Sequence, residues 1–149
     1  MKLFLFASGS LTNIRAGIGA NLRAVNKTSD AGMKARITQS AQMKIGSLGL
    51  LYCNEYHSFT TPFAGYSAPD VQRVETDVCR GEWYLPIRIH PLGSPRRQVH
   101  KDVAVANWTG PKEARANATA SMNLTGTTVL APRETSTDDW ALMLDAMAE

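Results

Sequence analysis

The pattern of apolar and polar positions predicts short strands that alternate with short helices. Its clearest feature is the stretch 43–63, which opens with a turn at residues 44–47 where Gly46 is free to take a positive φ. An apolar run of strand length, Leu48–Cys53, follows the turn and ends in a polar and aromatic group at residues 54–57. Such a strand crosses a core and delivers polar side chains to its far end, where we first expect a binding site.

The first half of the chain contains four further predicted elements. Residues 2–7 alternate only weakly, which indicates a strand buried on both faces. A small-residue loop at 8–13 precedes a short, irregular helix at 14–22, weakened by Gly17 and Gly19. A strand at 23–26 and a helix at 33–42 follow.

The second half is less regular. Residues 71–78 suit a half-exposed strand or a connection, and residues 84–92 suit a strand in which Pro86 indicates an edge or a bulge. A helix is expected at 112–120 and a last short strand within 122–130. A final acidic helix at 136–149 has Ser136 or Thr137 as its cap and places Trp140, Leu144 and Met147 at helical spacing, joined by Leu142 and Met143.

These elements do not follow a regular βαβ alternation. We therefore predict an α+β fold, with a curled mixed β-sheet flanked by short helices. With 149 residues and neither a repeat nor a linker, the whole range 1–149 is expected to form a single domain.

Composition limits the class of protein. Hydrophobic residues make up 44% of the chain and charged residues 19%, which are values of a globular protein. The apolar runs are too short for a membrane span, and residues 1–7 are too short for a secretion signal, so we expect a cytoplasmic protein without a membrane partner. Cys53 and Cys79 belong to no metal-binding motif, so neither a metal nor another cofactor is expected.

The net charge of +3 hides an asymmetry. Residues 134–149 carry five acidic side chains and no basic one, which leaves a net charge of +8 on the rest of the chain. A basic body suits a polyanionic partner such as nucleic acid, although an excess of this size also occurs in merely soluble basic proteins.

Catalytic chemistry has weak support in the sequence. No G-x-S-x-G motif is present, and His57, His90 and His100 are not spaced as metal ligands. A small cysteine-dependent enzyme with Cys53 and His57 as its reactive pair remains an alternative, although Cys53 ends a buried run where an inert thiol is expected. A second alternative is an interaction module that docks a partner through its C-terminal helix.

A binding role uses more of the residues. Proteins that hold single nucleotides combine aromatic faces, amides for the base edge and cations for phosphate. The chain offers Tyr52 and Trp83 as faces and Asn26 and Asn54 as amides, although each ring alone also fits an ordinary core role. The cations expected to contact the nucleic-acid backbone form two groups: Lys27, Lys34 and Arg36, then Arg96, Arg97 and Lys101.

The order of these segments resembles the PUA-like superfamily, nearest to its EVE and YTH domains. The resemblance rests on FLFASGS at the start, NLRAVN at 21–26, KIGSLGLLYCNEYHSF and GEWYLPIRI, over roughly residues 1–92. It implies a PUA-like barrel that reads a modified base flipped out of nucleic acid into an aromatic cage. It further implies that residues 24–27 line the pocket, that Asn26 or its neighbour contacts the base edge, and that residues 52–54 form another wall.

The chain departs from the family pattern at two positions. Arg23 stands where related domains tend to carry a cage tryptophan, and Cys79 stands where a second cage aromatic is plausible. Arg23 can stack on a base through its guanidinium plane. The resemblance implies a non-catalytic specificity module of a modification-dependent restriction system, with DNA favoured over RNA and a nuclease or motor subunit as partner.

Overall fold

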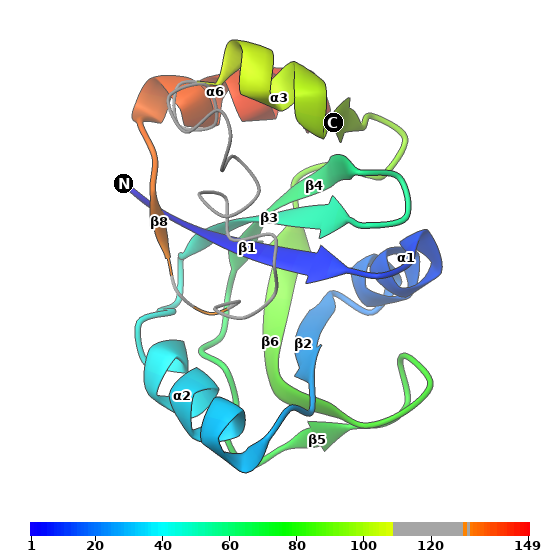
Figure 1. Cartoon of the computed structure of the whole chain (residues 1–149), viewed down its shortest axis with the longest axis vertical. Coiled ribbons are helices and arrows are strands. Elements are labelled where there is room, and N and C mark those ends of the chain that lie inside the picture. Colours follow the sequence, from blue (N-terminus) through cyan, green and yellow to red (C-terminus); the bar gives the residue numbers. More distant parts are fainter. Residues whose placement is uncertain (109–129, 131) are drawn as a thin grey trace.

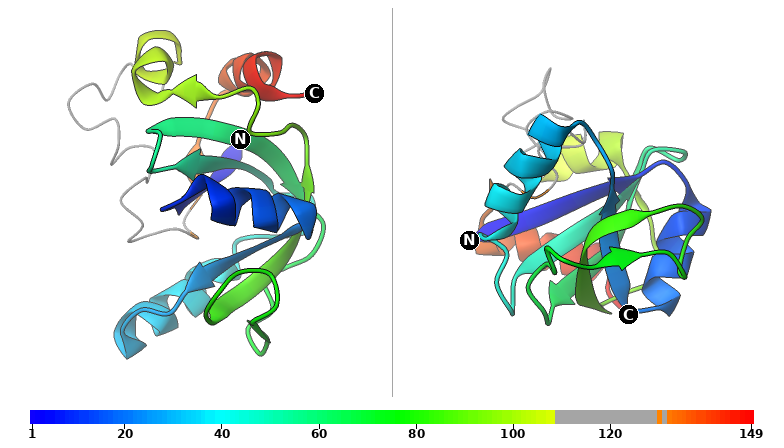
Figure 2. Two further views of the ribbon diagram at one scale, coloured as in Figure 1. Left: turned by 90° about the vertical axis from the view of Figure 1, so that its right-hand side faces the viewer. Right: turned by 90° about the horizontal axis from the view of Figure 1, so that it is seen from below.

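A computed structural model describes residues 1–108, 130 and 132–149. Within these residues the sheet has eight strands in the order β2-β6-β4-β3-β1-β8, with β5 added beside β6 and β7 beside β4. The sheet curls around a core, with α3 and α6 together over one face and α2 at the opposite end of the molecule (Figures 1 and 2). The predicted α+β class and curled mixed sheet with flanking helices are therefore confirmed. The elements are β1 (Lys2–Ser8), α1 (Leu11–Gly19), β2 (Leu22–Asn26), α2 (Asp30–Ser40), β3 (Leu48–Cys53), β4 (Ser58–Gly65), β5 (Val74–Glu75), β6 (Trp83–Pro91), β7 (Val99–His100), α3 (Lys101–Asn107), β8 (Arg133–Glu134) and α6 (Thr137–Met147).

Strands β1 and β3 run parallel through the middle of the protein and are buried on both faces, as the sequence predicts for residues 2–7. Because successive residues of a strand face opposite ways, Phe4 and Phe6 enter a first core inside the curl, whereas Leu3 and Leu5 enter a second core. The second core lies beneath α3 and α6, and its buried residues include Trp108, Met143 and Met147.

A β-bulge lies where β2 pairs with β6. Arg23 is opposite Ile87 and Val25 is opposite Tyr84, so Leu85 and Pro86 together face Ala24. Leu85 takes a positive φ of 53°, and Pro86 lacks the N–H that a regular ladder would use. The bulge expected at Pro86 is confirmed, and it bends β6 at the level of Arg23 and Ala24.

The helices begin at side-chain caps. Ser10 accepts a hydrogen bond from the amide of Asn13 at the start of α1, and Ser29 does the same for Gly32 in α2. The first helix therefore starts at Leu11, within the segment 8–13 expected to be a loop. The Ser10 cap stabilises this start more than Gly17 and Gly19 weaken the last turn of the helix. Ser136 caps α6 as predicted. The helix expected at 112–120 and most of the strand expected within 122–130 fall outside the described residues.

Candidate functional site

A hollow of about 480 Å³ opens where the end of β1 meets β2 and the start of β6. The loop after β1, the first turn of α1 and one side chain of α2 complete its wall. The described residues that line it are Ala7, Ser8, Gly9, Asn13, Arg23, Ala24, Val25, Asn26, Arg36 and Trp83.

Trp83 provides a flat aromatic wall. It is the first residue of β6, where it pairs with Asn26 of β2 on one side and Glu75 of β5 on the other. Its indole Nε1 donates a hydrogen bond of 3.2 Å to the carbonyl oxygen of Arg80, which fixes the ring against the preceding loop. The side chain is half-buried, so one part of the ring packs on protein while another part faces the hollow. A base can stack on such a face.

Arg23 brings a buried guanidinium to the same hollow. The residue is 8% exposed, and its Nη2 donates to the carbonyl oxygen of Ala7 at 2.8 Å. The guanidinium carbon lies 5.8 Å from the centre of the Phe6 ring. Burial lowers the pKa of Arg23 from its ordinary value to about 10, and a negative charge on Cys79 would oppose that shift. Its Nε is buried and has no hydrogen-bond partner among the residues that the structure describes.

Arg36 supplies a second guanidinium from α2. Its Nη1 donates to the backbone carbonyl of Asn26, which ties α2 to the end of β2. Burial lowers the pKa of Arg36 as well. Two arginines and no carboxylate therefore line this part of the described structure, together with the neutral polar side chains of Ser8, Asn13 and Asn26.

A smaller hollow of about 320 Å³ adjoins the first one and shares Arg23, Ala24 and Trp83 with it. Cys79 lines this second hollow, with its Sγ 3.9 Å from the carbonyl oxygen of Asn13. Arg23 and Cys79, the two positions where the chain departs from the family pattern, therefore meet at one place. Glu75 also lines this hollow, together with Leu22 and Val78.

The charge of Glu75 is already compensated. Its Oε2 accepts from Nη2 of Arg73 at 2.8 Å, and its Oε1 accepts from the amide of Asp77 at 3.1 Å. The backbone bond from Asp77 is the main reason why the pKa of Glu75 is lowered, ahead of the interaction with Arg73. Glu75 thus belongs to the loop around β5 and makes no ion pair with Arg23.

The structure brings together three of the five residues predicted to bind a base: Asn26, Trp83 and Arg23. Tyr52 and Asn54 are not among the lining residues, so the predicted second wall is wrong. Tyr52 is 3% exposed and enters the second core, where its ring lies 5.0 Å edge-on from that of Phe59. Asn54 is exposed on the turn after β3, and its backbone N–H donates to the carbonyl oxygen of Ser8 at 2.8 Å. Ser8, rather than residues 52–54, lines the hollow.

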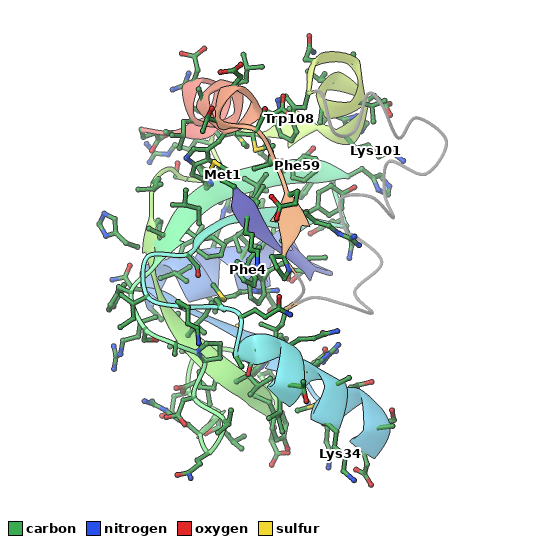
Figure 3. The ribbon with its side chains drawn as sticks, turned by 90° about the vertical axis from the view of Figure 1, so that its left-hand side faces the viewer. Met1, Phe4, Lys34, Phe59, Lys101 and Trp108 are labelled. Carbon is green, nitrogen blue, oxygen red and sulfur yellow. The ribbon has the colours of Figure 1, made fainter. Side chains whose placement is uncertain are left out.

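The six predicted backbone-binding cations do not form one surface. Arg36 lines the hollow, and exposed Lys27 directly follows Asn26. Lys34 and Lys101 lie at opposite ends of the molecule (Figure 3). Arg97 donates to the carbonyl oxygens of Ala148 and Asp145 beside the C-terminus. The group Arg96, Arg97 and Lys101 therefore belongs to the end of the protein that carries α3.

The structure does not favour either of the two alternative hypotheses, a cysteine-dependent enzyme and a module that docks through its C-terminal helix. Cys53 has no exposed surface and lies in the first core, whereas His57 is exposed on a turn, so the two do not form an accessible reactive pair. Helix α6 buries Met143 and Met147 in the second core and is part of the fold. A docking role for the whole helix does not fit that burial.

The sequence reasoning missed the wall formed by Ser8, Gly9 and Asn13. The feature of the sequence that indicates this wall is the loop at 8–13, which is rich in small and hydroxyl-bearing residues and which we expect only to connect two elements. Within the described part of the chain no cluster of three or more His, Cys, Asp or Glu side chains could hold a metal ion. A search of the same residues finds no helix with the length and apolar character needed to cross a membrane.

Comparisons with solved structures identify the fold. The chain is similar to the YTH domain of the Zygosaccharomyces rouxii MRB1 protein, solved in complex with N6-methyladenosine RNA (TM-score 0.56, 12% identity, covering 97% of this chain and 84% of that one). It is similar to the Pho92 YTH domain in complex with m6A (TM-score 0.58, 11% identity, 98% and 82%). It also resembles Rpa0253 from Rhodopseudomonas palustris (TM-score 0.57, 15% identity, 99% and 93%). No family model and no curated protein matches the chain. The fold is therefore YTH-like.

Proposed function

We propose that this protein binds nucleic acid by taking a single modified base into the hollow between β1, β2 and β6. The observation that carries the proposal is the combination of one half-buried aromatic face, Trp83, with two arginines and neutral polar groups around one concave site. The solved YTH domains, which bind N6-methyladenosine RNA or m6A, support it through their common fold.

Each lining group has a chemical task. The base stacks on the indole of Trp83, and Asn26, Asn13 and Ser8 offer donors and acceptors to its edges. Arg36 and exposed Lys27 lie on the β2–α2 side, where they can contact the phosphates that flank the flipped nucleotide. These roles require no catalytic group, in agreement with a binding module rather than an enzyme.

The finer assignments remain predictions. Membership of the EVE branch, a preference for DNA and a nuclease or motor partner come from the sequence resemblance, whereas the RNA complexes among the similar structures make RNA an equal candidate. Single-stranded DNA and RNA probes belong in the same experiment for that reason.

The test is fluorescence anisotropy with labelled 9-mers of DNA and RNA, each with a plain or a modified central base, at two salt concentrations. We expect Trp83→Ala to weaken binding about fivefold or more, because stacking on an aromatic side chain contributes about 1–3 kcal/mol per base. Tyr66→Ala removes an exposed ring that does not line the hollow and serves as the control. Equal affinities of the wild type, Trp83→Ala and Tyr66→Ala for every probe would refute the proposal.

A further inference from the structure

Arg23 is a buried cation whose hydrogen-bonding capacity is only partly used by the residues that the structure describes. A guanidinium has five N–H donors and no acceptor, so burial is favourable when those donors meet acceptors or a negative charge. The bond from Nη2 to Ala7 satisfies one donor, while Nε–H meets no acceptor in the described residues. Arg23 also forms no ion pair with any carboxylate that the structure describes. Arg23 is only 8% exposed and therefore lacks a counter-charge among the described side chains.

The surroundings of Arg23 increase the demand for an anion. Arg36 is the second charged residue lining the larger hollow, and it carries the same sign. In the smaller hollow the carboxylate of Glu75 is already bonded to Arg73 and to the amide of Asp77. The field at the junction of the two hollows is therefore positive, and it favours a negative group.

A neutral methyl substituent suits this place poorly. Trp83 is the one aromatic side chain among the described residues that line either hollow, so rings do not enclose a methyl group from two sides. An apolar group against Arg23 would bring the guanidinium no further acceptor. An oxyanion in the same position accepts from Arg23 and neutralises its charge.

From this arrangement we propose that the bound nucleotide presents an oxyanion to Arg23, and that where this oxyanion belongs to the base the hollow selects an acidic rather than a methylated base. The oxyanion is a carboxylate substituent on the base or a phosphate oxygen of the same nucleotide. This inference rests on the proposed base-binding function and specifies the chemical class of its ligand. No covalent step is involved.

The experiment uses three single-stranded 9-mers that differ in one central base: 5-carboxylcytosine, 5-methylcytosine or cytosine. Each is titrated at one fixed salt concentration against the wild type, Arg23→Met, Arg23→Lys and Trp83→Ala. Arg88→Met, which removes an exposed arginine from the same strand as Trp83, controls for the general loss of one positive charge.

For a base carboxylate we expect wild type to bind the 5-carboxylcytosine probe about tenfold or more tighter than the other two, since a hydrogen bond to a charged group contributes about 1.5–3 kcal/mol. Arg23→Met should abolish that preference, and Arg23→Lys, which keeps the charge, should retain part of it. For a phosphate oxygen, Arg23→Met should weaken all three probes to the same extent, by about tenfold, while Arg88→Met does not.

Two results would overturn the inference. In the first, the 5-methylcytosine probe binds at least as tightly as the carboxylated probe, and Arg23→Met binds all three probes like the wild type. In the second, Arg23→Met and Arg88→Met have equal effects on the affinity. Failure of the base-binding function itself looks different, because Trp83→Ala would then leave the affinity for every probe unchanged. Circular dichroism of each variant confirms that it is folded.

Discussion

Replacing Arg23 by methionine is expected to leave the free protein about as stable as the wild type. Methionine is flexible enough to follow the apolar stem of arginine, and it brings no charge into the core. The structure gives the magnitude: the pKa of Arg23 falls from its ordinary value to about 10 on folding because the guanidinium is buried. At about 1.4 kcal/mol per pKa unit, the charged form is disfavoured in the folded state by about 3 kcal/mol.

Two contacts offset part of that penalty. The hydrogen bond to Ala7 contributes about 1.5–3 kcal/mol because its donor is charged, and the contact with the Phe6 ring contributes about 0.5–1 kcal/mol. These contacts together offset about 2–4 kcal/mol of a penalty of about 3 kcal/mol, so we expect the free energy of unfolding of Arg23→Met to stay within about 1 kcal/mol of the wild type. This differs from the loss of about 2–5 kcal/mol typical of truncating a large buried side chain.

The sign of the pH effect follows from the same shift. Since the folded pKa of Arg23, about 10, lies below the unfolded one, the unfolded state binds more protons once the pH exceeds about 10, and this group alone makes stability rise with pH there. At neutral pH both states are charged and the full penalty applies.

The assay is urea denaturation at pH 7.5, followed by circular dichroism, for the wild type, Arg23→Met, Arg23→Ala and Arg88→Met. Arg23→Ala removes packing as well as charge and should be less stable than Arg23→Met, while the exposed Arg88→Met should change the free energy by less than about 0.5 kcal/mol. A loss above about 2 kcal/mol for Arg23→Met would mean that the guanidinium is well satisfied without a ligand. The argument for an oxyanion would then be refuted.

Three further predictions concern packing and burial. Gly49→Ala places a Cβ against the phenylalanine ring of the neighbouring strand and should lower the free energy of unfolding by about 1–3 kcal/mol. Gly19→Ala, in a helix with open space around the new Cβ, should raise it by about 0.5–1 kcal/mol. The reverse order of stability in urea denaturation would contradict the packing. Met147→Ala should remove about 2–4 kcal/mol because this side chain of α6 is 0% exposed, and the 49% exposed Leu142 should tolerate alanine; equal melting temperatures would show that α6 is not part of the core. Burial raises the pKa of Tyr52, so its unfolded form ionises first and the native state loses stability as the pH rises above about 10; Tyr52→Phe should reduce that loss between pH 9 and pH 11, and an unchanged loss would exclude the effect.

The sequence predicts much of this fold because several of its signals are local. The apolar runs of β1 and β3, the proline bulge in β6 and the serine cap of α6 each depend on a few neighbouring residues. Three predicted site residues also meet, because Asn26 and Trp83 pair across two strands and Arg23 lies three residues before Asn26.

The failures concern facts that no local pattern encodes. In the run Leu48–Cys53 every position is buried or half-buried, so there is no alternation to show which face Tyr52 occupies. Arg96 and Arg97 are basic, as Lys34 is, but the tertiary contacts of Arg97 place them beside the C-terminus, at the far end of the molecule from Lys34 (Figure 3). The loop at Ser8 becomes a wall of the hollow only because β1 and β2 end beside it. Such long-range placement requires the three-dimensional structure.

The pairing of β1 with β8 has a consequence for the newborn chain on the ribosome. Leu3 of the first strand pairs with Arg133, and the amino group of Met1 donates to the carbonyl oxygen of Thr135 at 2.9 Å, across a separation of 134 residues. Translation at about 5–20 residues per second leaves this edge of the first strand waiting roughly 7–27 s for that neighbour. During this interval the unpaired edge is available to chaperones and to other nascent chains. Slow translation of the residues between β1 and β8 would lengthen that period.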